Sequence, residues 1–153
     1  MPVRTPANVN LDQLRDTIIA ISNEMGGKLI YQHNEQGTFV VRQLDGSLRV
    51  EPIVVGTAIG VNPVANVTNG EVIVAMIHTH VPNGNPDLMY PSSPNNSTNG
   101  RGDTTDMQAM MQTGHVDPGA LYYIVDTSTA LTYEYTWIGP MGGIDITRDT
   151  VYY

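Results

Sequence analysis

Two of the four histidines, His78 and His80, stand two residues apart at the end of an apolar run over residues 72–77. The run is rich in β-branched residues, which are typical of a buried strand. Because residues i and i+2 lie on the same face of a strand, both imidazoles should be directed toward one place. Imidazole nitrogens bind zinc, and a catalytic zinc usually has three protein ligands and a water molecule. The pair therefore predicts a metal site that needs one further ligand.

A carboxylate from further along the chain is the best candidate for that ligand, because the chain contains no cysteine. Asp106 is preferred, since it stands near the start of a short helix expected from about residue 104 to Gly114, where an acidic side chain also favours the helix dipole. Asp103 could be a ligand, a hydrogen-bond acceptor that supports one of the ligands, or a helix cap. Asp87 is nearer to the histidines in sequence. The choice among the three aspartates stays open.

The elements that must position these residues follow from the spacing of apolar residues and turn formers. A first helix is expected to begin after the N-cap Asn10 and to end at Gly26-Gly27. Its apolar positions at helical spacing are Leu11, Leu14, Ile18 and Ile21. Strands are expected near residues 28–32, 38–43, 50–55, 72–78, 121–125 and 131–138, with turns at Glu35-Gln36-Gly37, Asp45-Gly46 and Asp126-Thr127-Ser128.

This order of elements predicts an α+β domain with a mixed sheet flanked by two helices. We expect one domain over residues 10–139, a flexible leader over residues 1–9 and a tail over residues 140–153. The irregular stretch 81–103 is rich in proline and asparagine, and long loops of this kind are usually functional or disordered.

Charge and composition narrow the classes of partner. The 153 residues carry a formal net charge of −8, which disfavours nucleic acid and anionic membranes. The N-terminus has no apolar signal region, and no apolar run approaches the ~20 residues of a membrane span. We therefore expect a cytoplasmic protein, or one secreted without a classical signal peptide.

The order of Glu24, His78-Thr79-His80 and Asp106 resembles the signature of the JAB/MPN (JAMM) metalloprotease-like superfamily, a Glu followed by His-x-His-Pro and Ser-x-x-Asp. Residues 23–31 and 77–80 look most like a bacterial branch that is found at the C-terminal ends of RHS-type and other polymorphic toxins. The resemblance covers roughly residues 10–138. It implies a cytidine-deaminase-like layered α/β/α arrangement.

The resemblance also implies a function, namely zinc-dependent cleavage of a peptide or isopeptide amide bond. Zn²⁺ would be held by His78, His80 and Asp106, and Glu24 would take a proton from the attacking water and give it to the leaving amine. The implied partners are a polypeptide substrate and, for a toxin or effector domain, an immunity or delivery protein.

Three departures from the signature keep alternatives open. The loop after His80 is much longer than in the family, which leaves the choice of aspartate open. Pro82 follows His80 by two residues rather than one, and Asp103 stands where the family has a serine that helps bind the water or the oxyanion. A carboxylate there would repel an oxyanion, which favours a catalytically degenerate protein-interaction module. A third interpretation is an unrelated α+β binding protein in which the His-x-His is structural.

Overall fold

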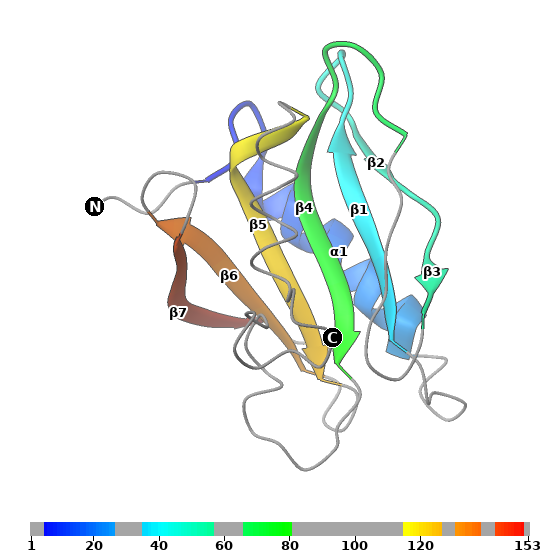
Figure 1. Cartoon of the computed structure of the whole chain (residues 1–153), viewed down its shortest axis with the longest axis vertical. Coiled ribbons are helices and arrows are strands. Elements are labelled where there is room, and N and C mark those ends of the chain that lie inside the picture. The colour runs from blue at the N-terminus through cyan, green and yellow to red at the C-terminus, as the bar shows by residue number, and fades with distance from the viewer. Residues whose placement is uncertain are drawn as a thin grey trace.

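The computed structural model describes residues 5–26, 35–56, 66–80, 115–126, 131–138 and 143–151. They form one helix and a seven-stranded sheet (Figure 1). The elements are α1 (Leu11–Gly26), β1 (Gln36–Arg42), β2 (Leu48–Val50), β3 (Val54–Val55), β4 (Val72–His80), β5 (Val116–Asp126), β6 (Thr132–Ile138) and β7 (Gly143–Val151). The predicted mixed α+β fold is confirmed. The second expected helix, near residues 104–114, lies outside the described residues.

The sheet is open, with the strand order β2-β1-β4-β5-β6-β7 and with β3 pairing β1 beside β2. β4 and β5 are parallel, and the other pairs are antiparallel. β4 therefore lies inside the sheet, with β1 on one side and β5 on the other. Both neighbours extend to its C-terminal end, where the two histidines are.

The helix α1 begins and packs as its sequence predicts. The side chain Oδ1 of Asn10 accepts a hydrogen bond from the backbone N–H of Gln13 at 3.0 Å, which satisfies one of the free donors of the first turn. The residues at helical spacing that become buried are Leu14, Ile18, Ile21 and Met25. One apolar stripe therefore faces the sheet.

The two faces of the sheet carry two separate apolar clusters. Alternation along the strands places neighbours in sequence on opposite faces. The α1 stripe packs against a face that includes Ile77, Tyr123 and Val125. The opposite face includes Met76, Tyr122, Ile124 and Tyr135. Figure 1 shows α1 crossing one face diagonally, behind β5, β4 and β1.

A buried carboxylate fastens α1 to β6. Glu134 is 3% exposed and accepts two hydrogen bonds from the Arg15 guanidinium, at 3.0 and 2.7 Å. The hydroxyl of Tyr123 donates a third, at 2.7 Å to Oε2. Burial raises the pKa of this tyrosine, and the neighbouring negative charge adds to the effect, so Tyr123 remains a donor.

Two local predictions were wrong in their boundaries. The turn expected at Glu35-Gln36-Gly37 is instead partly strand, because Gln36 and Gly37 pair with β3 and Gly37 also pairs with His78 of β4. The single strand expected at 50–55 is two short strands. Pro52, which has no backbone N–H to donate, lies between them.

β5 is longer than predicted, and the N-terminal segment packs against its start. The strand begins at Val116 and passes through Pro118 and Gly119, where its pairing with β4 is irregular. The side chain of Asp117 accepts hydrogen bonds from the backbone N–H groups of Ala7, at 3.2 Å, and Gly119, at 2.7 Å. A Cβ at position 119 would collide with the carbonyl oxygen of Thr5.

Candidate metal site at the end of β4

His78 lies near the C-terminal end of β4 and is almost completely buried. Its Cα partners are Gly37 on β1 and Ile124 on β5, and the residue is 2% exposed. Alternation places it on the face of Met76, opposite the one that α1 covers. Residue 80 falls on the same face, two positions further along β4. The strand predicted from the sequence therefore sets the two histidine positions as expected.

The His78 imidazole contacts Tyr122 on the neighbouring strand. The Tyr122 hydroxyl oxygen lies 2.8 Å from Nδ1 and 3.4 Å from Nε2 of His78. The oxygen is therefore close to both ring nitrogens rather than in line with the in-plane direction of Nδ1. The rings also meet edge to face, with centroids 5.2 Å apart and planes at 88°. Tyr122 is 0% exposed, so the contact is a buried one.

Asp126 is a carboxylate at this site that the sequence analysis interpreted only as a turn residue. It ends β5, its Cα partner is His80, and it is 8% exposed. Alternation places it on the face of Tyr122 and Ile124 and therefore beside the His-x-His positions. The signal was present in the sequence, because extending the predicted strand by one residue places an acidic residue two positions beyond Ile124 on the same face.

Glu24 is exposed and lies in the last turn of α1. The helix reaches this end of the sheet, since the buried hydroxyls of Ser22 and Thr132 are 2.8 Å apart. Thr132 pairs with Val125, which in turn pairs with Thr79 between the two histidines. Figure 1 likewise shows the C-terminal ends of α1 and β4 at the same end of the sheet. Glu24 approaches this end from the α1 side, whereas His78 lies on the other face.

The predicted ligand Asp106, and Asp103 and Asp87 with it, lie outside the described residues. Within the described ranges, no group of three or more His, Asp or Glu side chains is close enough to hold a metal ion. Of the predicted ligands, His78 alone has a described side chain, and its imidazole is a donor that zinc prefers. A complete site requires at least one further ligand.

Gln36 is a buried polar group near this end of β1. Its backbone N–H donates to the Thr79 hydroxyl at 2.8 Å. Its side chain is 0% exposed, and among the described residues neither the amide nitrogen nor the amide oxygen has a hydrogen-bond partner. Unpaired buried amides are rare in native structures, and they often occur where a protein has a function to serve.

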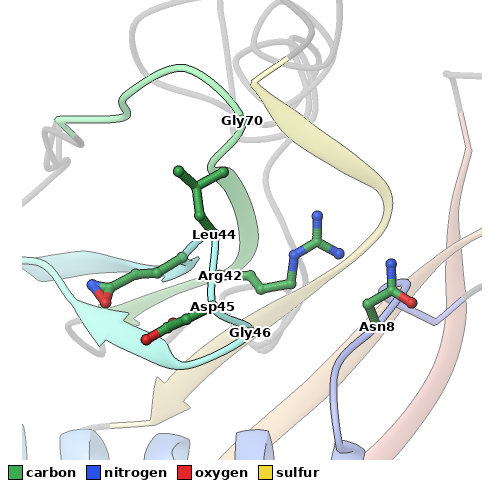
Figure 2. Close-up of a pocket in the computed structure, with 7 residues that line it drawn as sticks. Asn8, Arg42, Leu44, Asp45, Gly46 and Gly70 are labelled. Carbon is green, nitrogen blue, oxygen red and sulfur yellow. The ribbon is translucent and has the colours of Figure 1, made fainter.

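A hollow lies at the opposite end of β1. It has a volume of about 330 Å³ and lies around the turn between β1 and β2 (Figure 2). Its lining is formed by Asn8, Arg42, Gln43, Leu44, Asp45, Gly46 and Gly70. None of these residues was predicted to act chemically, and the hollow is remote from His78, so we do not connect it with the metal site.

Over the described residues, no helix is long and apolar enough to cross a membrane. Comparisons of the chain with models of protein families, with curated proteins and with solved structures found no match.

Proposed function

We propose that this chain is a zinc-dependent hydrolase of the JAB/MPN type that cleaves a peptide or isopeptide amide bond, as a toxin or effector domain of bacterial origin. The observation that carries the proposal is the placement of the His-x-His pair. Positions 78 and 80 share one face at the C-terminal end of an internal strand, and Asp126 is the Cα partner of His80 on β5. Sites are commonly built where rigid strands end.

The third ligand is proposed from the resemblance and not from the strand pairing. Asp87, Asp103 and Asp106 all belong to the connection between β4 and β5, so the pairing of these strands does not distinguish among them. We keep Asp106 as the proposed ligand, with Asp103, Asp87 and now Asp126 as its alternatives.

In this proposal some residues bind the metal and others transfer the proton. A zinc ion held by His78, His80 and Asp106 would supply Lewis acidity for a water molecule and for the scissile carbonyl. Glu24 accepts the proton of the attacking water and returns it to the leaving amine. Asp103, at the family's serine position, would orient the water. The net charge of −8 favours a basic or neutral polypeptide as the substrate.

Two other functions are each favoured by one observation. Asp103 at the serine position favours a catalytically degenerate interaction module with the same fold. The burial of His78 and its close contact with Tyr122 favour an unrelated α+β protein with a structural histidine.

Metal content and one carboxylate variant separate the three. We expect about one zinc ion per chain in protein purified without chelator, and none in the variant His78→Ala/His80→Ala. Glu24→Gln should keep its zinc and lose amide-bond turnover against a peptide library. Asp16→Asn, an exposed change on the same helix, should keep both.

Each failure points to a different alternative. Wild-type protein that takes up no zinc would mean that the histidines are structural. Zinc binding without turnover in the wild type would favour the interaction module. Full turnover in Glu24→Gln would remove this residue from the mechanism. Circular dichroism on every variant would show that a lost metal is not a lost fold.

A further inference from the structure

We propose that residues 5–9 form a strap that opens as a unit of its own, while the sheet that it crosses stays folded. The strap leads into α1 and is held mainly at one position, Ala7. It is a conformational device built into the fold, and it does not depend on the proposed function. The inference is carried by two hydrogen bonds between charged side chains and the backbone of Ala7.

The side chains that hold Ala7 come from two strands that are not neighbours. The Ala7 N–H donates to Oδ2 of Asp117 on β5, at 3.2 Å, and the Ala7 carbonyl accepts from Nη1 of Arg42 on β1, at 2.6 Å. β4 lies between these strands, so the strap spans three strands at one end of the sheet. Hydrogen bonds with a charged partner are stronger than neutral ones. Ala7 is therefore held between a cation and an anion.

The backbone of the strap fits this place on both sides of Ala7. Before it, the Thr5 carbonyl oxygen lies where a Cβ at position 119 would have to be, so Gly119 makes room for the strap. After it, Asn8 has a φ of 56°, in the left-handed region that asparagine adopts more readily than most residues. The strap therefore has one defined path into α1.

The strap buries little apolar surface, which separates its release from the unfolding of the domain. Thr5, Ala7 and Asn8 are exposed, Val9 is half-buried, and Pro6 alone is buried. Segments with few buried apolar contacts open locally, at a lower free energy than the core. The cost of opening this strap therefore lies mainly in the two hydrogen bonds of Ala7.

Release also leaves no buried charge without a partner. Asp117 is 7% exposed with the strap in place, and water reaches its carboxylate once Ala7 has left. The N–H of Gly119 still donates to the same carboxylate, at 2.7 Å. Asn8 and Arg42 both line the hollow of Figure 2, so release changes its shape as well. A polypeptide that binds the released segment competes with Arg42 and Asp117 for the Ala7 backbone.

Native-state hydrogen exchange of the full-length protein, followed by NMR at several urea concentrations below the unfolding transition, tests the proposal. We expect the Ala7 N–H to exchange more slowly than in an unstructured peptide, but at least about 100-fold faster than the N–H of Ile77 in β4. The rate at Ala7 should change little with urea, because local opening exposes little surface. The rate at Ile77 should rise steeply.

Two results for the wild type would overturn the proposal. Equal rates and an equal urea dependence at Ala7 and Ile77 would mean that residues 5–9 are released only when the whole domain unfolds. Exchange at Ala7 as fast as in an unstructured peptide would mean that the two hydrogen bonds do not hold the segment in solution.

Two arginine variants give a matched comparison. Arg42→Met removes the donor to the Ala7 carbonyl and keeps an unbranched side chain, so the Ala7 N–H should exchange about 10-fold faster. Arg49→Met removes an arginine that binds Glu71 and Glu51, so it should speed exchange at Ile77 and leave the rate at Ala7 unchanged. Faster exchange at Ala7 in both variants, or in neither, would contradict a strap that opens on its own.

Discussion

At position 36 the chain buries a primary amide whose nitrogen and oxygen both lack a hydrogen-bond partner within the part of the chain that the structure describes. Leaving such a group unpaired costs about 1–3 kcal/mol, and an apolar side chain of similar shape avoids that cost. We therefore expect Gln36→Met to raise the free energy of unfolding by about 1–2 kcal/mol in urea denaturation. Gln13→Met, at an exposed position of α1, should change it by less than about 0.5 kcal/mol.

A loss of stability in Gln36→Met would show that the amide is satisfied in solution, for example by a buried water molecule. A gain in stability together with a loss of turnover would instead mean that Gln36 is kept for the site and not for the fold. Natural proteins tend to break a local rule of this kind where function requires it.

Single residues of the site were predictable where the signal is local. The placement of His78 and His80 follows from a two-residue spacing at the end of one apolar strand, and no distant contact is needed to infer it. Asp126 was missed because Asp is also a turn former, and only the pairing of β5 with β4 shows that the strand extends to it.

At the scale of elements, the docking of α1 depends on an ion pair of unequal exposure. The side chain of Arg15 is 36% exposed, whereas the side chain of Glu134 is 4% exposed. Removing the arginine therefore leaves a buried carboxylate without its countercharge. We expect Arg15→Met to lower the free energy of unfolding by about 2 kcal/mol, less than for a fully buried pair. Adding Glu134→Gln should recover part of this loss, because the amide oxygen still accepts the Tyr123 hydroxyl and the charge is gone.

Thermal unfolding of Arg15→Met, Glu134→Gln and the double variant gives a double-mutant cycle, which measures the interaction between the two residues. The result that would contradict this account is a double variant that loses the full sum of the two single losses, since that would mean that Arg15 and Glu134 act independently.

Elements whose boundaries depend on nearby residues were predicted well, and those that depend on distant pairing were not. The cap at Asn10 and the stripe of α1 lie within one helix, and that helix was placed correctly. The residues Gln36 and Gly37 favour a turn locally, but pairing with strands on both sides overrides that preference. Pro118 likewise suggests a strand end, yet β5 continues through it with an irregular register.

At the scale of the whole molecule, the acid stability should depend on one cluster at the β2 edge. Arg49 binds Glu71 through two hydrogen bonds, at 2.7 and 3.1 Å, and it also pairs with Glu51 at 3.1 Å. The bonds from Arg49, followed by those from Thr68, lower the pKa of Glu71 from near 4.5 to about 2. A lowered folded-state pKa contributes stability that is complete above the unfolded value.

We therefore expect the stability difference between the wild type and Glu71→Gln to be constant above about pH 4.5 and to shrink as the pH falls toward about 2. Urea denaturation at a series of pH values measures this difference directly. Asp12→Asn, an exposed substitution in the first turn of α1, serves as the control with a charge change elsewhere. A difference that does not vary with pH would show that the Arg49 contacts do not hold the carboxylate charged.

The contacts of α1 also determine when the protein can fold during its synthesis. The helix emerges from the ribosome well before the strand that holds it, because Arg15 and Glu134 are 119 residues apart in the chain, and Ser22 and Thr132 are 110 apart. Until β6 has been made, the nascent chain cannot complete the surface on which the helix rests. Contacts this distant in sequence delay the completion of the fold. Folding of this domain therefore waits for β6 and does not simply grow from α1 onward.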